Sequence, residues 1–446
     1  MPDWVEHAMW WHVYPLGFTG AEKHALADDV APVHRFEHLT RWLDYVVELG
    51  LNGIALGPVF ASATHGYDTV DHLRVDPRLG TEEELVAFVD AAHARGLRVT
   101  LDGVFNHVGR GFARFQQVLW QGPGADTESW FRLRWPAEPG PGSEPEYDDF
   151  EGHHALVALN HDEPEVARYV AEVMTYWLDR GVDGWRLDAA YAVPPSFWGR
   201  VLPEVRAAHP DAFVFGEVLH GDYAAFVGES GVDAVTQYEL WKSIWSSLND
   251  GNFFELTWTL SRHDELLDTF VPVTFVGNHD VTRIASRLSD TRHLAHALAV
   301  LLTVGGSPTI YAGDEQGLTG VKEEREGGDD AVRPAFPPEP GELVPGGWDV
   351  YRLHQDLVGV RRRNPWLHRA RVEVLTCTNT RLVYRAHAAD GVVLVALSLE
   401  DAPVTLESPG ATEVLAGSAD LHEPGSGAVV GLAPHGWAVL GAPSPA

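Results

Sequence analysis

Cysteine is almost absent from this chain, because Cys377 is the single cysteine among 446 residues. A lone thiol excludes an intrachain disulfide and any metal cluster built from several cysteines, and it suits a reducing compartment. Long apolar runs are also lacking, since no stretch approaches the ~18 uninterrupted apolar residues of a membrane span. The first residues, MPDWVEHAMWWHVYPLGF, carry no Lys or Arg of the kind that opens a signal peptide. We therefore expect a cytoplasmic protein with no membrane partner.

Basic residues are scarce relative to acidic ones. Lys and Arg number 32 against 64 Asp and Glu, which gives a formal net charge of −32. Such a surface repels phosphate backbones and anionic lipid, so nucleic acid is not an expected partner. The remaining composition is ordinary, with 45% hydrophobic and 22% charged residues. It predicts a globular chain with a large core rather than a disordered one.

Short apolar runs alternate along the chain with longer amphipathic ones, which is the pattern of parallel βα units. The sequence therefore predicts an α/β protein built on a (β/α)8 TIM barrel. The expected strands cover residues 10–16, 51–56, 98–104, 182–188, 212–218, 234–238, 271–277 and 307–312. The expected helices cover residues 39–49, 81–95, 163–180, 292–304 and 349–363.

Two segments interrupt this alternation. Residues 107–162 follow the third strand and contain AEPGPGSEPEYDDFEGHH, a Pro-, Gly- and acid-rich stretch that predicts a small irregular inserted domain over the pocket. Residues 371–446 contain apolar runs such as VVLVALSL and predict a C-terminal antiparallel β domain. The barrel then comprises residues 1–106 and 163–370.

Carboxylate-bearing segments recur at the ends of four expected strands. Because the strand C-termini of a (β/α)8 barrel open onto one face, Asp188, Glu217 and Asp280 should meet in one pocket. An acid, a nucleophile and a third carboxylate can cleave or transfer a glycosidic bond through a covalent intermediate. The segments are DGVFNH (102–107), DGWRLDAA (183–190), FGEVLHGD (215–222) and FVGNHD (275–280).

The second and third segments predict the nucleophile and the acid. Arg186 and Asp188 lie two residues apart on a strand and share one face, so the guanidinium would lower the pKa of Asp188 and keep it ionised. A structural ion pair at a strand end explains the same spacing equally well. Glu217 follows the apolar run AFVFG, where partial burial favours the protonated form of a general acid. Taken alone, it also fits a solvated loop residue.

The first and fourth segments predict supporting groups. Asp280 and His279 would bind sugar hydroxyls as positive charge develops on the sugar, although a turn or a helix cap would use the same residues. Asp102 would brace Arg186, and His107 would donate to a substrate hydroxyl unless it is a core histidine. Four such segments at four strand ends favour the functional interpretation more than any one of them does.

Together these segments resemble the signature regions of the alpha-amylase family, glycoside hydrolase family 13, over about residues 10–363. The resemblance implies that Asp188 is the nucleophile, Glu217 the general acid/base and Asp280 the stabiliser of the transition state. The insertion would be the family's domain B. The resemblance also implies substrate contacts by Arg186, His107, His279 and by Tyr67 of HGYD, a stacking platform unless it is a packing tyrosine.

Departures from the family pattern narrow the expected substrate. Tyr191 and Ala192 stand where many alpha-amylases have Lys-His, which favours short oligosaccharides over long polymers. His220 in GEVLH is similar to the cyclomaltodextrinase and neopullulanase branch and is a candidate substrate contact. We expect the N-terminal domain of that branch to be missing, because the chain begins near the first strand. Arg333, in the acidic loop after the eighth strand, is a further candidate substrate contact.

Calcium is the one metal that the resemblance raises, and no cofactor is required by the expected chemistry. Asn106 matches a calcium ligand of the family, but the family's LPDLN segment is LVALN here, with Ala158 in place of an aspartate. Because Ca²⁺ takes ~6 to 8 oxygen ligands, the sequence leaves a calcium site open.

The sequence predicts a retaining enzyme that cleaves α-glucosidic bonds of maltooligosaccharides or short α-glucosides by double displacement. Its expected partner is an α-glucan oligosaccharide. Two alternatives remain: a transglycosylase or glucosyl isomerase that uses the same site, and a non-catalytic sugar-binding protein on an amylase fold. The first would release rearranged sugars, and the second would turn over no α-glucoside.

Overall fold

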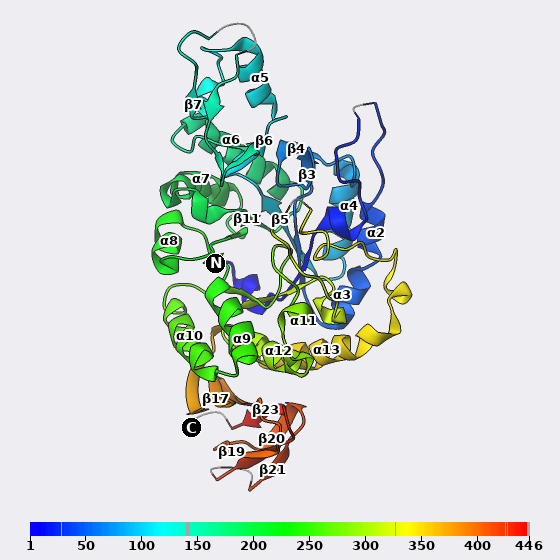
Figure 1. Cartoon of the computed structure of the whole chain (residues 1–446), viewed down its shortest axis with the longest axis vertical. Coiled ribbons are helices and arrows are strands. Elements are labelled where there is room, and N and C mark those ends of the chain that lie inside the picture. The colour runs from blue at the N-terminus through cyan, green and yellow to red at the C-terminus, as the bar shows by residue number, and fades with distance from the viewer. Residues whose placement is uncertain (28, 140–142, 326, 424, 426, 444–446) are drawn as a thin grey trace.

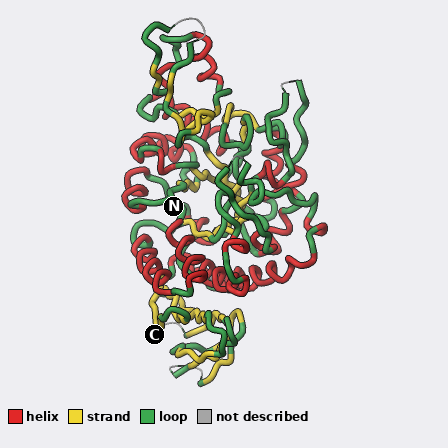
Figure 2. Tube along the Cα trace, viewed as in Figure 1, coloured by secondary structure: helices red, strands yellow, loops and turns green. Residues whose placement is uncertain are grey.

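The computed structural model describes residues 1–27, 29–139, 143–325, 327–423, 425 and 427–443. Three parts follow one another along its long axis in Figure 1, with the inserted segment at the top, the barrel in the middle and the C-terminal part at the bottom. Figure 2 shows helices around the barrel and mainly strands in the C-terminal part. Within the described ranges, no helix has the length and apolar character that crossing a membrane requires.

Eight parallel strands form the barrel, as the sequence predicts. Their order is β13-β12-β11-β5-β2-β1-β15-β14, and a parallel bridge between Thr236 and Val273 joins the two ends of this row. Most strands are shorter than expected, because the chain leaves the sheet where the polar residues of the loops begin. The strands are β1 (Trp10–Val13), β2 (Gly53–Leu56), β5 (Arg98–Gly103), β11 (Gly184–Leu187), β12 (Phe213–Gly216), β13 (Ala234–Val235), β14 (Val273–Phe275) and β15 (Ser307–Tyr311).

Helices cover the outside of the barrel through buried apolar faces. In α6 the side chain of Glu163 caps the first turn, Pro164 occupies the first position, and Trp177 is 0% exposed against the sheet. In α4 the side chains of Thr81 and Glu84 form a capping box. These caps satisfy main-chain N–H groups that a helix start leaves without partners.

The helix expected over residues 39–49 is interrupted, so that α2 and α3 share it. The α-helices are α1 (Pro15–Phe18), α2 (Phe36–Thr40), α3 (Leu43–Leu49), α4 (Glu82–His93), α5 (Ala113–Gln121), α6 (Pro164–Leu178), α7 (Pro195–Ala208), α8 (Tyr223–Ser230), α9 (Tyr238–Asp250), α10 (Phe253–Leu266), α11 (Ile284–Arg287), α12 (Leu294–Thr303) and α13 (Trp348–Arg363). The 3₁₀ helices are η1 (Asp3–His7), η2 (Glu128–Trp130), η3 (Ala190–Ala192), η4 (Thr291–His293), η5 (Asp314–Gln316), η6 (Pro340–Glu342), η7 (Pro345–Gly347) and η8 (Pro365–Arg369).

The inserted segment is more regular than its composition predicts. β6 (His107–Gly109) pairs antiparallel with β10 (His153–Ala158), which also pairs with β9 (Asp149–Phe150). β7 (Leu133–Arg134) and β8 (Glu146–Tyr147) form a second ladder. The prediction of an irregular segment was wrong, because these short strands pair across long loops and local composition does not reveal such pairing.

The C-terminal domain is an antiparallel β structure, as predicted. One sheet has the order β16-β17-β18-β23-β20 and the other the order β19-β22-β21. Val383, Leu394 and Val430 are buried in the apolar core between them. The strands are β16 (Arg371–Cys377), β17 (Arg381–Ala388), β18 (Gly391–Ser398), β19 (Val404–Glu407), β20 (Glu413–Gly417), β21 (Asp420–His422), β22 (Val429–Leu432) and β23 (Trp437–Ala442), and a separate hairpin near the barrel mouth comprises β3 (Phe60–Ser62) and β4 (Thr69–Val75).

We expect Gly184→Ala to destabilise the barrel. A Cβ at this position would lie 2.1 Å from the main-chain oxygen of Phe213 in the paired strand β12. Overpacking of this kind costs about 1–3 kcal/mol of unfolding free energy, which urea denaturation would measure. Gly228→Ala in α8 is the control, because its Cβ would meet no atom within 4 Å. Equal stability of the two variants would contradict this account.

Candidate functional site

A cavity of about 790 Å³ opens at the C-terminal ends of the barrel strands. Asp188 and Glu217 line it and directly follow the last residues of β11 and β12, and Asp280 lines it from the loop after β14. Because Leu187 and Gly216 are partners in the parallel ladder, the next residue of each strand emerges beside its neighbour. The barrel thus gathers three carboxylates that are far apart in the sequence.

One guanidinium binds three carboxylates at the base of this cavity. Nη1 of Arg186 donates to the two oxygens of Asp102 at 2.6 and 2.7 Å and to Oδ1 of Asp188 at 3.2 Å. Its Nη2 lies 3.0 Å from Oε2 of Glu217. None of these four side chains is more than 9% exposed. Since Arg186 and Asp102 are partners in the ladder between β11 and β5, strand register brings the charges together.

The pKa of Asp188 is raised well above its ordinary value, contrary to the expectation from the sequence. Burial of the carboxyl is the main cause; Arg186 acts in the expected direction, but the negative charges of Glu217 and Asp102 add to the effect of burial. The expected lowering of this pKa was wrong because the spacing of Arg186 and Asp188 identifies a charged neighbour but does not reveal how deeply the Asp188 carboxyl is buried. Nucleophilic attack requires the ionised carboxylate, which burial of Asp188 opposes and the contact with Arg186 favours.

Two hydrogen bonds orient Glu217, and a third orients one of the donors. The hydroxyl of Tyr238 donates to Oε1 at 3.0 Å, and the main-chain N–H of Ala189 donates to Oε2 at 3.1 Å. Asn278 donates to the Tyr238 hydroxyl at 2.9 Å, which turns the hydroxyl proton of Tyr238 towards Glu217. The sequence predicted Tyr238 only as the last residue of a strand, whereas in the structure it is the first residue of α9, shortly after β13.

Asp280 lies between two basic side chains. Nε2 of His279 is 2.9 Å from Oδ2, and Nη2 of Arg333 is 2.7 Å from Oδ1. Burial opposes ionisation of this carboxyl, yet His279 and Arg333, with a smaller effect of Arg186, hold its pKa well below the ordinary value. Arg333 also pairs with Asp329 at 3.0 Å, so it orients Asp280 instead of reaching into the cavity.

Three aromatic rings stack beside Asp280. The rings of Tyr67 and His279 stack with centroids 5.3 Å apart, and Tyr14 stacks on the same imidazole at 6.0 Å. The hydroxyl of Tyr67 donates to Asp102 at 3.1 Å and contacts Nε2 of His279. The ring of Tyr67 is therefore fixed at the cavity surface. Tyr14, which the sequence did not single out, belongs to this stack.

His107 lines the cavity and makes its polar contacts within the protein. Its Nε2 bonds the main-chain oxygen of Tyr67 at 3.0 Å, and its Nδ1 is 3.0 Å from the amide nitrogen of Asn106. The ring stacks on Phe150 with centroids 4.7 Å apart. Burial lowers the pKa of His107 to about 4. It is a neutral side chain that holds the inserted segment against the cavity.

His220 is not brought into the cavity. Its side chain is exposed, and the cavity wall includes the preceding Leu219 in its place. Its ring lies 6.5 Å from that of Tyr191, whose hydroxyl donates to Glu151 of the inserted segment at 2.8 Å. The predicted substrate contact by His220 therefore has no direct support from the geometry.

The outer part of the cavity is walled by α9 and α10, two helices that the sequence analysis did not identify. Trp241 and Trp258 line it together with Lys242 and Glu255, which form an ion pair. Trp258 is 63% exposed, so it presents a large apolar surface to solvent at the cavity mouth. The sequence feature that could have indicated this wall is the presence of the two tryptophans in otherwise polar helical segments.

Comparison with known proteins agrees with this architecture. Residues 33–336 match the alpha-amylase family, described as "Alpha amylase, catalytic domain". A maltogenic alpha-amylase of Bacillus acidopullulyticus is 34% identical over 72% of this chain and 58% of its own length. A cyclomaltodextrinase of Geobacillus thermopakistaniensis is 30% identical over 92% of this chain and 71% of its own. The solved structure of a Nostoc punctiforme debranching enzyme has a TM-score of 0.85 at 27% identity and covers 99% of both chains.

The residues around Asn106 do not fit a calcium ion. Asp148 and Asp149 line a small cavity with Asn106, but each already contacts a basic neighbour, and the guanidinium of Arg132 lines the same space. Ala158 lies there without an oxygen-bearing side chain. In the part of the chain that the structure describes, no three His, Cys or acidic ligands converge at this point.

We expect added Ca²⁺ to leave the melting temperature of chelator-treated protein unchanged. The reason is that a hard cation at Asn106 would meet a guanidinium and too few free oxygen ligands. Differential scanning calorimetry with and without CaCl₂ measures the response, with Asn106→Ala as the matched variant. A rise of several degrees that Asn106→Ala abolishes would show that the site does bind calcium.

Proposed function

The chain belongs to the alpha-amylase family of glycosidases, and we propose that it is a retaining hydrolase of α-glucosidic bonds in short glucans. One observation carries the proposal: a single guanidinium, that of Arg186, contacts both Asp188 and Glu217 in a cavity that Asp280 also lines. Two carboxyls on one guanidinium leave little room for a water between them and the sugar. Such proximity favours attack by a carboxylate itself, the retaining arrangement.

In the proposed first step the glycosidic bond lies over Asp188 and Glu217. Glu217 donates a proton to the leaving oxygen while ionised Asp188 attacks the anomeric carbon and forms a glycosyl ester. Asp280, kept ionised by its basic neighbours, stabilises the positive charge that develops on the sugar ring. Tyr67 offers its fixed ring to the apolar face of the same sugar.

In the second step water attacks the anomeric carbon. Glu217 accepts the proton of that water, the bond to Asp188 breaks, and two inversions leave the original configuration. A sugar hydroxyl in place of water would give a transglycosylation product by the same steps. Chromatography of the products distinguishes these reactions, and an absence of turnover on every α-glucoside would indicate a sugar-binding protein.

Short glucans are the proposed substrates. Tyr191 occupies the position of a lysine in many alpha-amylases, and its bond to Glu151 ties the loop after β11 to the inserted segment. Both residues line the cavity, and we expect their contact to hinder a long unbranched polymer. The names of the similar proteins, a maltogenic amylase, a cyclomaltodextrinase and a debranching enzyme, support linear, cyclic and branched short glucans as the substrates to test.

We also propose a cellular location and domain limits for the chain. A cytoplasmic location is supported by the single Cys377, which suits a reducing compartment. The net charge of −32 argues against a nucleic-acid or anionic-membrane partner. The proposed domains are residues 1–106 with 163–370, residues 107–162, and residues 371–446. Their support is the change of sheet at each limit.

We expect Asp188→Asn and Glu217→Gln to lower turnover of maltotriose by at least about 10²-fold, since an amide can neither attack nor donate the proton. Glu229→Gln, which removes an exposed carboxylate outside the cavity, is the control. Proton NMR of the first products of the unaltered enzyme should show the α-anomer. Full turnover by either active-site variant would refute the assignment, and a first-formed β-anomer would refute retention.

We expect Asp102→Asn to move the acidic limb of the activity profile to lower pH. Burial and then neighbouring negative charges, that of Asp102 among them, raise the pKa of Asp188. Because attack needs ionised Asp188, activity is lost as pH falls through that pKa, and removal of a negative neighbour lowers it. The control is Asp126→Asn at an exposed carboxylate. A limb that stays in place or moves to higher pH in Asp102→Asn would contradict the assignment.

We expect Trp258→Ala to lower kcat/KM for maltoheptaose about fivefold while kcat/KM for maltose stays the same. Only the longer sugar reaches the exposed indole at the cavity mouth, where loss of apolar contact costs about 1 kcal/mol. Trp120→Ala is the matched control, because Trp120 is 84% exposed and lies outside the cavity. Equal effects of Trp258→Ala on both sugars would argue against an outer subsite on α10.

A further inference from the structure

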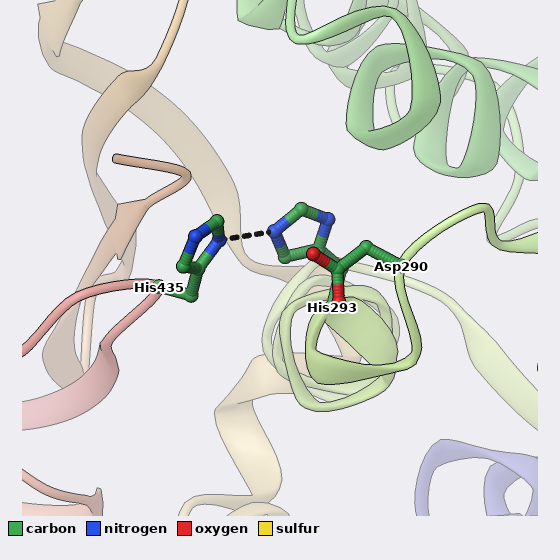
Figure 3. Close-up of side chains that lie close together, drawn as sticks. All are labelled: Asp290, His293 and His435. Carbon is green, nitrogen blue, oxygen red and sulfur yellow. Dashed lines mark hydrogen bonds between the residues drawn. The ribbon is translucent and has the colours of Figure 1, made fainter. Parts of the chain in front are cut away.

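Two histidines from different domains face each other where the barrel meets the C-terminal β domain (Figure 3). His293 ends η4, which leads into α12, and His435 lies in the turn between β22 and β23. Nε2 of His293 and Nδ1 of His435 are 2.9 Å apart. Asp290, the N-cap of η4, brings its carboxylate to the same place, and one ligand atom from each of the three lies within 4.8 Å of the others.

The spacing of the two imidazole nitrogens is close to that of a tetrahedral zinc site. Zinc binds imidazole nitrogen at about 2.0–2.1 Å, so two such ligands lie about 3.3 Å apart. The observed separation of 2.9 Å needs only a slight opening of the histidine pair to admit the ion. Two imidazoles and a carboxylate, with a fourth position for water, suit Zn²⁺, whereas Ca²⁺ and Mg²⁺ take oxygen ligands.

A second carboxylate fixes the tautomer that a metal ligand requires. Nε2 of His435 is 2.8 Å from Oδ1 of Asp401. Because that carboxylate can only accept, Nε2 carries the proton and Nδ1 turns its lone pair towards the cluster. Histidine ligands of metals commonly donate their other N–H to a carboxylate in this way. The arrangement at His435 therefore already has the outer hydrogen bond of a metal site.

Arg292 is the competitor of a metal for Asp290. Its guanidinium donates to both oxygens of that carboxylate, at 2.6 to 3.0 Å. The Arg292 side chain is 56% exposed, and such a pair is weak because water and salt screen it. Asp401 lies 4.0 Å from the same guanidinium, so Arg292 can turn to a second carboxylate when an ion takes an oxygen of Asp290.

From this geometry we propose that Asp290, His293 and His435 bind one Zn²⁺ ion that joins the barrel to the C-terminal β domain. The ligands come together only in the folded chain, since His293 and His435 are 142 residues apart. An ion that binds the folded state alone raises its stability. None of the three ligands lines the large cavity, so glycosidase activity at moderate temperature does not depend on the ion.

The test is titration of the chelator-treated full-length protein with ZnCl₂, followed by calorimetry and thermal unfolding. We expect one Zn²⁺ per chain and a melting temperature that rises with its concentration. Asp401→Asn should weaken the affinity about 10- to 100-fold, the usual effect of losing such an outer hydrogen bond. His435→Gln, which removes a ligand, should weaken it at least as much. Arg292→Ala should bind more tightly, because the competing cation is gone.

His24→Gln is the matched control, because it removes an exposed histidine elsewhere and should respond to zinc as the unaltered protein does. The decisive quantity is the zinc-dependent change and not the melting temperature itself. A purely structural His435 would lower the metal-free melting temperature in His435→Gln and leave the zinc response intact. That result, or no zinc binding by the unaltered protein, would overturn the proposal and leave a hydrogen-bonded histidine pair.

Discussion

The site depends on the buried guanidinium of Arg186. It contacts Asp102, Asp188 and Glu217 at once, in a place where none of the four side chains is more than 9% exposed. Carboxylates so close together repel one another, and burial makes each charge costly to hold. A single positive charge among three acids therefore fixes their positions and leaves an excess of negative charge that favours binding a proton. The acid and base chemistry of the cavity begins with this imbalance.

The barrel creates the imbalance through the register of parallel strands. Arg186 is the ladder partner of Asp102, and the residue after each of β11 and β12 carries one of the two proposed reacting carboxyls. Environment then separates the acids: the pKa of Asp188 is raised by burial, while His279 and Arg333 outweigh burial and lower that of Asp280. Acids whose pKa values are driven apart in one cavity take different roles in one reaction.

Much of the fold and of the cavity follows from sequence pattern. Alternating apolar runs define the strands, and the common direction of strand C-termini explains why Asp188, Glu217 and Asp280 line one space. The direction of the Asp188 pKa shift could not be predicted, because it depends on burial by segments far away in the sequence. The inserted sheet was missed for a related reason, since its strands pair across long loops.

Side chains without a local pattern were also missed. Tyr238 acts through a hydrogen bond to Glu217 that only the folded arrangement of β13 and α9 creates. Trp258 reaches the cavity from α10, which lies outside the strand-end segments on which the sequence argument relied. Conversely, His220 lies in a segment, GEVLH, that resembles a branch of the family, but its side chain is exposed in the structure. Sequence motifs identify the strand ends well, but they do not predict which side chains of the helices and loops line the cavity.

The most direct test of the central claim is to identify the residue that bonds to the sugar. A 2-deoxy-2-fluoroglucosyl fluoride slows the second step more than the first, because the electronegative fluorine destabilises a positively charged transition state while the good leaving group speeds attack. Mass spectrometry of peptides from the inactivated protein should then place one sugar on Asp188. A sugar on Glu217 or Asp280 would contradict the account.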